Sequence, residues 1–344
     1  PGQPPQFVAR GAEGFTDADP VTPDSLFRIY SMTKPVTGMA AMLLVDEGRL
    51  GLDQPLADIL PKFAKMQVQV TPDGSLTDVR PAKVPITIRH LLTHTAGLGY
   101  IIVQRGPLQK AFAEQGLGAG RITRLKVPIM GMTEGRSVTG LDQFCDRLAA
   151  LPLVYEPGSK WSYSVGLDVI GRVIEVVSGM PFDQFLKRSI FEPAGMTSTF
   201  FQVPAKEAKR LTANYGAMGA NLVPIDPGET SIYLDKPPAP FGGTGLVSSP
   251  RDYDRFLALL ANFGHAGRER ILGELAVRVG TGNLLPDGVS GPAMMGPVSD
   301  FGAGGRVGIG AERGIFGLSG AAGTVGTVDM RRGIRSSICR LKAS

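Results

Sequence analysis

Apolar runs with helical spacing alternate along this chain with short extended pieces bounded by glycine and proline. One such run, 36–45, is rich in Ala, Met and Leu and is followed by Gly48. Because these residues favour helices and glycine commonly follows a helix end, the run predicts a buried helix from about Ser31 to Glu47. The same spacing predicts further helices at 86–97, 141–151, 167–179 and 250–260.

The last third of the chain has a different pattern. Glycines become frequent, and the β-rich pieces at 314–324 and 323–329 predict strands of a sheet. A further strand is possible at 6–11. Residues 101–140 are irregular and glycine-rich, which is typical of a lid or a binding loop. The end of the chain, 330–344, has neither helical nor strand periodicity and is expected to be a solvated or disordered tail.

Composition narrows the class of protein. The 344 residues are 43% hydrophobic, enough for one large domain or two intimate ones. No apolar segment reaches the roughly eighteen residues of a membrane span. The net charge is +5 and the pI about 9.2, but the basic residues are scattered except at the end, so nucleic-acid binding is not expected. That terminal cluster consists of Arg331, Arg332, Arg335, Arg340 and Lys342.

Cysteine and histidine usage points away from a metal. Two cysteines lie far apart and are expected to be reduced thiols of a cytoplasmic protein, although the first residue is Pro1 and a natural start, with any export signal, could be missing. Three histidines form no ligand cluster with carboxylates at zinc spacing, so a catalytic metal is not expected. No organic cofactor is expected either. The residues concerned are Cys145, Cys339, His90, His94 and His265.

The candidate chemistry begins at Ser31 and Lys34. Residues three apart share a helix face, so the Lys34 amine can reach the Ser31 hydroxyl and, if burial keeps it neutral, take the hydroxyl proton. The backbone N–H groups of a helix N-terminus would favour negative charge beside the serine. Alternatively, Ser31 is only a helix cap and Lys34 a solvated side chain. The long apolar run after Lys34 favours burial and therefore the chemical interpretation.

Four other residues could serve either the chemistry or the structure. Tyr163 lies in a loop just before a predicted helix, where its phenol can point into a cleft or merely pack beside Trp161. Ser319 nearly fits a G-x-S-x-G motif, but Ala321 occupies the position of the last glycine, so we do not expect Ser319 to be the nucleophile. His90 and His94 are expected to be structural, satisfying backbone groups in a loop.

Several short motifs occur in an order that resembles a known family. They are Ser31-Met32-Thr33-Lys34-Pro35, Leu91-Leu92-Thr93-His94-Thr95-Ala96-Gly97-Leu98, Tyr155-Glu156-Pro157-Gly158 with Tyr163-Ser164, and Phe241-Gly242-Gly243-Thr244-Gly245-Leu246-Val247-Ser248-Ser249. Together they resemble the serine β-lactamase-like superfamily, closest to family VIII carboxylesterases and class C β-lactamases, over about 22–329. Relatives usually carry further elements at both ends, so the chain is expected to be truncated or altered there.

This resemblance implies a fold and a set of roles. The fold would be a mostly antiparallel sheet flanked by helices, formed by 1–50 plus 211–344, with a helical subdomain at 51–210. Ser31 would be acylated, Lys34 would take its proton or tune the site, and Tyr163 would activate the deacylating water. The backbone N–H groups of Ser31 and Ala321 would form the oxyanion hole.

Two departures from the family pattern favour an esterase over a β-lactamase. The chain has Tyr163-Ser164-Val165 where β-lactamases have Tyr-x-Asn, and Leu318-Ser319-Gly320 where they have Lys-Thr-Gly. With no lysine there, the substrate pocket at Leu318, Ser319 and Gly320 favours neutral, apolar acyl groups. We therefore expect a metal-independent esterase for short-chain acyl esters, monomeric or homodimeric. A β-lactamase, a D-amino-acid peptidase, an acyltransferase and a non-catalytic binding protein stay open.

Overall fold

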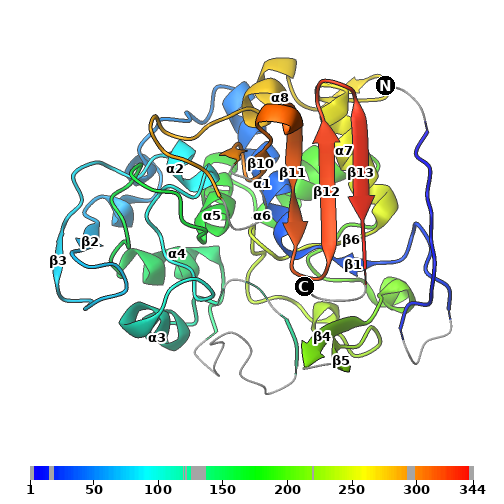
Figure 1. Cartoon of the computed structure of the whole chain (residues 1–344), viewed down its shortest axis with the longest axis horizontal. Coiled ribbons are helices and arrows are strands. Elements are labelled where there is room, and N and C mark those ends of the chain that lie inside the picture. Colours follow the sequence, from blue (N-terminus) through cyan, green and yellow to red (C-terminus); the bar gives the residue numbers. More distant parts are fainter. Residues whose placement is uncertain are drawn as a thin grey trace.

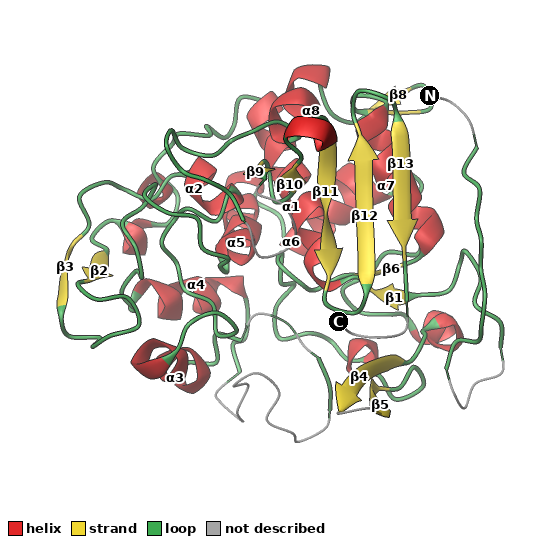
Figure 2. Ribbon diagram, in the orientation of Figure 1, coloured by secondary structure: helices red, strands yellow, loops and turns green. Residues whose placement is uncertain are grey.

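A twisted antiparallel sheet backed by helices forms one side of the molecule, and a mostly helical region forms the other (Figure 1). The computed structural model describes residues 4–14, 19–118, 120, 122–124, 137–218, 221–292 and 299–340. Helices, strands and loops are intermixed along the chain, as the secondary-structure view shows (Figure 2). The predicted mixed fold with a mostly antiparallel sheet flanked by helices is confirmed.

The main sheet has five strands in the order β13-β12-β11-β10-β9, and every neighbouring pair is antiparallel. Among the described residues, four shorter strand pairs lie outside it: β1 with β6, β2 with β3, β4 with β5, and β7 with β8. The strands are β1 Phe27–Arg28, β2 Gln67–Gln69, β3 Val79–Pro81, β4 Asn214–Met218, β5 Asn221–Asp226, β6 Val247–Ser248, β7 His265–Ala266, β8 Glu269–Arg270, β9 Asp300–Phe301, β10 Arg306–Val307, β11 Ile315–Gly320, β12 Thr324–Asp329 and β13 Ile334–Ile338.

Some of the α-helices pack on one face of this sheet, and others form the helical region beside it (Figure 1). Helix α1 contacts α5, α8 and β11, and α7 lies behind β12 and β13 (Figure 1). The helices are α1 Thr33–Asp46, α2 Ile88–Leu92, α3 Gly106–Glu114, α4 Leu141–Ala149, α5 Gly166–Ser178, α6 Phe182–Leu186, α7 Pro250–Ala261 and α8 Glu274–Gly280. Short 3-10 turns connect several of them, and the one that matters for the site is η1, Tyr30–Met32.

Helix α1 forms the centre of the core. Its residues are buried from Thr33 through Leu44, so it is buried on all sides and mostly apolar rather than amphipathic. The prediction of a buried helix here is confirmed, but the helix begins two residues later than expected. Ser31 therefore belongs to the preceding turn η1 and not to the first turn of α1.

Helix α7 fixes the sheet to the core. Ser249 caps it by accepting a hydrogen bond from the Asp252 N–H, at 3.1 Å. The Tyr253 ring lies so close to β12 that a Cβ at Gly326 would be 2.2 Å from a ring carbon. Only a glycine therefore allows this helix and this strand to pack together.

Four elements differ from the predictions. The terminal segment contains the edge strand β13, and 6–11 forms no strand. Helix α2 ends at Leu92 instead of Gly97, and 101–140 includes helix α3, although 119, 121 and 125–136 lie outside the described residues. The four residues 341–344 of the predicted tail also lie outside them.

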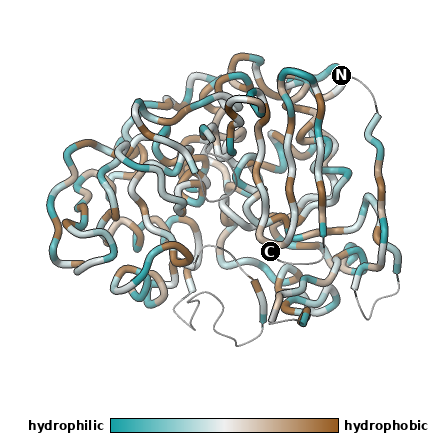
Figure 3. Tube along the Cα trace, in the orientation of Figure 1, coloured by the Kyte–Doolittle hydropathy of each residue, from teal (hydrophilic) through white to brown (hydrophobic). Residues whose placement is uncertain are grey.

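Strand β13 lacks the usual pattern of apolar residues facing the core, because its two isoleucines face outward. Ile334 and Ile338 are 59% and 47% exposed, whereas Arg335 turns inward and pairs with Asp254 of α7 at 2.6 Å. Arg332 similarly pairs with Asp329, at 2.9 Å. The turn between β12 and β13 is strongly hydrophilic (Figure 3). The basic cluster is thus partly neutralised by carboxylates within the fold.

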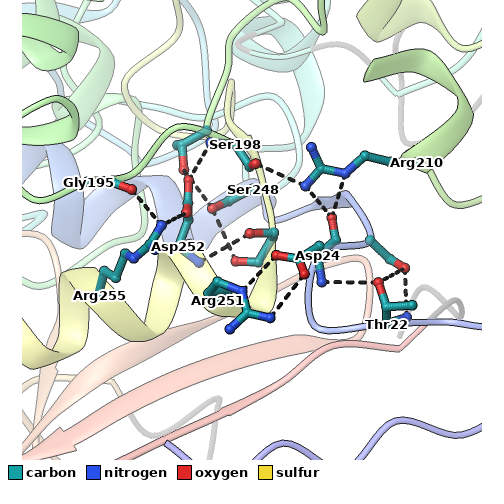
Figure 4. A network of polar contacts seen from close by, with 12 residues as sticks. Thr22, Asp24, Gly195, Ser198, Arg210, Ser248, Arg251, Asp252 and Arg255 are labelled. Atoms are coloured by element: carbon teal, nitrogen blue, oxygen red, sulfur yellow. Dashed lines mark hydrogen bonds and ion pairs between the residues drawn. The ribbon is translucent and has the colours of Figure 1, made fainter. Parts of the chain in front are cut away.

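A group of charged residues ties α7 to distant loops (Figure 4). Asp252 accepts from the Ser198 N–H at 2.6 Å and pairs with Arg255 at 2.9 Å. Arg251 pairs with Asp24 at 2.7 Å. We call Asp24, Arg251, Asp252 and Arg255 the paired network, because each charge in it has a partner of opposite sign.

Candidate active site

Ser31 is presented by a strained turn. It is half-buried in η1, and Tyr30 before it has a φ of 39°, a left-handed conformation that is unusual for a residue other than glycine. The Tyr253 hydroxyl donates to the Met32 carbonyl at 3.1 Å. The Asn214 amide donates to the Tyr30 hydroxyl, also at 3.1 Å. Strain held in place by such contacts clusters at functional sites in proteins generally.

The structure brings Ser31, Lys34 and Tyr163 together. The Tyr163 hydroxyl donates to Ser31 Oγ at 2.7 Å, and Lys34 Nζ donates to the same oxygen at 3.3 Å. Lys34 is 1% exposed, which agrees with burial and not with the solvated alternative. Its Nζ also donates to the Gly243 carbonyl at 2.7 Å and lies 4.6 Å from the centre of the Tyr163 ring.

Tyr163 both packs and reaches the serine, so the two interpretations of this residue are not exclusive. It lies in the loop before α5, with its ring centre 6.1 Å from that of Trp161 and 5.8 Å from that of Tyr100. The ring of His94 is nearer, at 4.7 Å. These aromatic neighbours fix the direction of the phenol toward Ser31.

His90 and His94 both accept hydrogen bonds from backbone N–H groups, as predicted. His90 Nδ1 accepts from the Thr87 N–H at 3.2 Å and helps to cap α2. His94 Nδ1 accepts from the Ser164 N–H, also at 3.2 Å. Complete burial holds the pKa of His94 well below its ordinary value, and the nearby Lys34 charge acts in the same direction. His94 is therefore a neutral ring beneath Tyr163.

The sequence interpretation missed Asp168. It lies in the first turn of α5, is 2% exposed, and accepts from the Gly243 N–H at 2.8 Å. Burial raises the pKa of its carboxyl from 3.8 to about 6, although the Lys34 charge opposes that rise. A lone carboxylate inside the apolar run Leu167–Ile170 was the signal that could have revealed it.

Strand β11 borders the site. A Cβ at Gly320 would lie 2.2 Å from the Ile29 carbonyl oxygen, so the end of this strand touches the chain just ahead of Ser31. Ala321 follows directly. Leu318 is buried, and Ser319 is half-buried.

Two cavities meet at Tyr163. The smaller, of about 150 Å³, is lined by Leu318 and Ser319 together with Trp161, Tyr163, Pro292, Phe301, Arg306, Ile315, Gly317, Val325 and Thr327. The larger, of about 500 Å³, also includes Trp161, Tyr163 and Pro292. Its remaining lining residues are Val103, Tyr155, Ser159, Lys160, Ser162 and 288–291.

Arg306 is a cation in the wall of the smaller cavity that the sequence interpretation also missed. It comes from β10, opposite Gly317 of β11, and pairs with Glu312 at 2.6 Å. The cavity is therefore mainly apolar with one ion pair at its edge.

Among the described residues, no cluster of three or more His, Cys, Asp or Glu side chains has the geometry to bind a metal ion. No helix among those residues has the length and apolar character needed to span a bilayer.

Comparison with known proteins assigns the family. The family described as Beta-lactamase matches residues 6–337. Protein Rv1367c of Mycobacterium tuberculosis is 34% identical over 277 residues, 80% of this chain and 64% of that protein. Esterase EstB of Burkholderia gladioli is 32% identical over 280 residues, 75% of this chain and 64% of EstB. The chain thus spans slightly less than two thirds of the length of these relatives.

A solved structure agrees with these matches. EstCE1, described as a hydrolase with promiscuous acyltransferase activity, superposes with a TM-score of 0.75 at 27% identity, over 97% of this chain and 84% of EstCE1. The family match covers almost all of the chain, and the order of motifs and the antiparallel sheet agree with it. The chain belongs to the beta-lactamase family.

Proposed function

We propose that this protein is a serine esterase that hydrolyses short-chain acyl esters through an acyl-enzyme on Ser31. The observation that carries the proposal is the meeting of three side chains: the Ser31 hydroxyl lies 2.7 Å from the Tyr163 hydroxyl and 3.3 Å from Lys34 Nζ. A hydroxyl becomes a good nucleophile when a neighbouring group removes its proton, and both neighbours are within reach. The likeness to EstB and EstCE1 supports the ester class.

The reaction would take two steps. In acylation, Ser31 Oγ attacks the ester carbonyl while its proton passes to Lys34 or Tyr163, and the alcohol leaves with a proton from the same pair. In deacylation, water attacks the acyl-enzyme, gives a proton to that pair, and the carboxylic acid is released as Ser31 recovers its own. The N–H groups of Ser31 and Ala321 would stabilise the oxyanion in both steps.

The roles divide between two parts of the chain. In this proposal the helical subdomain at 51–210 supplies Tyr163, and the sheet domain at 1–50 plus 211–344 supplies Ser31, Lys34 and Ala321. The reaction uses only these protein groups and water.

The smaller cavity supports a short, apolar acyl group. A dry cavity of about 150 Å³ holds a molecule the size of benzene, and the cavity beside Tyr163 has that volume, about 150 Å³. Leu318 lines it where β-lactamase relatives carry a lysine. Short neutral acyl groups would fit there, and long chains would extend beyond it.

Ester turnover by two serine variants tests the proposal. We expect the wild type to hydrolyse p-nitrophenyl acetate and butyrate faster than the decanoate. Ser31→Ala should lose activity by about 10⁶-fold, as nucleophile removal does in other serine hydrolases. Ser319→Ala, the matched substitution in the G-x-S-x-G-like segment, should lose far less. Intact-protein mass spectrometry after brief exposure to the ester should find one acyl group, on the peptide that contains Ser31.

Three results would contradict the proposal. Equal activity in Ser31→Ala and wild type would exclude Ser31 as the nucleophile. Acylation of the peptide with Ser319 would move the nucleophile to β11. Turnover of nitrocefin or of a D-Ala-D-Ala peptide well above ester turnover would assign the site to a β-lactamase or a peptidase.

Acyl transfer is a second candidate. The likeness to EstCE1 favours it, and the larger cavity of about 500 Å³ borders Tyr163 and could admit an acceptor alcohol. Adding increasing concentrations of a small alcohol during butyrate turnover measures the partition. A constant yield of free acid would exclude transfer, and a falling yield with matching new ester would support it.

A further inference from the structure

Lys34 and Asp168 are two buried ionisable groups that are both hydrogen-bonded to Gly243. Lys34 is 1% exposed and Asp168 is 2% exposed. Lys34 Nζ donates to the Gly243 carbonyl at 2.7 Å, and the Gly243 N–H donates to Asp168 Oδ1 at 2.8 Å. The ammonium and the carboxylate are therefore joined through the two polar groups of a single residue.

A glycine is required at position 243 for this loop to come so close to Asp168. A Cβ there would lie 2.8 Å from Asp168 Oδ2, closer than real Cβ contacts. A Cβ at Gly242 would lie 2.4 Å from the Leu167 carbonyl oxygen. The glycines of this loop thus allow the segment before β6 to press against the start of α5, where Asp168 is found.

A buried ammonium needs a compensating charge or a set of good acceptors. The contacts that Lys34 makes with Ser31, Gly243 and Tyr163 are with a hydroxyl, a carbonyl and an aromatic ring. Asp168 supplies the negative charge, because it accepts from the N–H of the same Gly243 whose carbonyl accepts from Lys34. Burial raises the pKa of the Asp168 carboxyl, and the Lys34 charge opposes that rise. Its own position in the first turn of α5 further favours the ionised carboxylate.

We propose that Asp168 is a positioning residue for the reaction, which holds Lys34 in place and sets its charge through Gly243. An ionised Asp168 favours the Lys34 ammonium. A neutral side chain at this position favours the free amine. The consequence for catalysis rests on the proposed function, because it assumes that Lys34 exchanges protons with Ser31 or Tyr163.

Other ionisable groups face this pair. Lys34 is near Tyr163 and His94, and Asp168 is near Tyr100 and Cys145. Burial holds the pKa of His94 well below its ordinary value and raises the pKa values of Tyr100 and Cys145 well above theirs. These three groups are therefore neutral near pH 6, where the pKa of Asp168 lies.

The pH profile of kcat/KM for p-nitrophenyl butyrate tests the proposal with Asp168→Asn. Loss of the carboxylate removes a negative charge that favours the ammonium, so one limb of the profile should move to lower pH, by about one unit. The direction is the same whether the reaction needs the free amine or the ammonium. Asp252→Asn removes another buried carboxylate, outside the site, and should leave the limbs in place even if it lowers the melting temperature.

An unchanged profile in a folded Asp168→Asn variant would overturn the proposal. So would an equal displacement in Asp252→Asn, because that would make the effect a general response to destabilisation.

A measurement on the wild-type chain does not depend on the folding of Asp168→Asn or on turnover. With ¹³Cε-lysine labelling, and with the signal assigned through Lys34→Arg, the Lys34 resonance should show an inflection near pH 6 as Asp168 titrates. Its absence would overturn the inference. If the wild type neither hydrolyses esters nor becomes acylated, the proposed function fails, while this inflection still decides whether Asp168 and Lys34 are coupled.

Discussion

The polar side chains around Ser31 and the charged side chains of the paired network differ in their partners, because only in the paired network is each charge bonded directly to a charge of opposite sign. In the paired network, Arg255 meets Asp252 at 2.9 Å and Arg251 meets Asp24 at 2.7 Å (Figure 4). At Ser31, the Lys34 amine meets a hydroxyl, a carbonyl and an aromatic ring.

This difference separates two uses of polar side chains. A charge bonded directly to its opposite is held in one state, and it fixes chain segments together. An amine that meets neutral acceptors, with its carboxylate one residue away, suits the proton exchange with a neighbouring hydroxyl that the proposed function requires. The same pairing that would make Lys34 a good structural residue would make it a poor participant in acyl transfer.

Among these substitutions, Tyr163→Phe should have the largest effect on activity and little effect on stability. It removes the hydroxyl 2.7 Å from Ser31 Oγ and keeps the ring that packs on His94. We expect kcat/KM for p-nitrophenyl butyrate to fall by about 10²- to 10⁴-fold, the usual contribution of a proton-transfer group. The melting temperature should stay near that of the wild type. Activity close to wild type would remove Tyr163 from the proposed mechanism.

Arg28→Met should instead lower the stability of the fold and leave the specific activity unchanged. Arg28 and Asp226 pair at 2.6 Å, and each is 1% exposed. Removing one partner leaves a buried charge uncompensated, so we expect the free energy of unfolding to fall by about 3–5 kcal/mol. Denaturant unfolding measures this loss, and the folded fraction should retain its specific activity.

A double variant is the control for Arg28. In Arg28→Met combined with Asp226→Leu no charge is left unpaired, so part of the stability should return. Greater loss in the double variant than in the single one would contradict the assignment of the effect to an uncompensated charge.

Arg251→Gln should have the smallest effect. Its pair with Asp24 has the same chemistry as Arg28 with Asp226, but the two side chains are 40% and 49% exposed. Water already solvates such charges, so we expect a loss below about 1 kcal/mol by the same unfolding measurement. A loss as large as that of Arg28→Met would mean that the network acts as a unit, whatever the exposure of its members.

Much of the site was predictable because its parts are local. The spacing of Ser31 and Lys34 places both on one side of a turn leading into an apolar helix, and the order of motifs pointed to Tyr163. The predicted helices at 141–151, 167–179 and 250–260 are confirmed as α4, α5 and α7. Helical periodicity is a property of neighbouring residues, so it can be read without knowing what the helix packs against.

Other parts were not predictable because they depend on partners far along the chain. Strand β13 escaped detection since its inward residue is Arg335, whose partner Asp254 is 81 positions away. Arg306 reaches the smaller cavity only because β10 pairs with β11 in a register that places it opposite Gly317. Neither contact can be recognised from the local pattern of apolar and polar residues.

The sequence by itself determined the class of fold, the buried helix α1 and the pairing of a serine with a lysine three residues later. Only the tertiary structure decided that Lys34 shares Gly243 with Asp168, across separations of 209 and 75 residues. Local spacing fixes which side chains lie on one face of a helix. Which buried carboxylate compensates which amine depends on how closely two backbones approach, and that is set by the packing of the whole core.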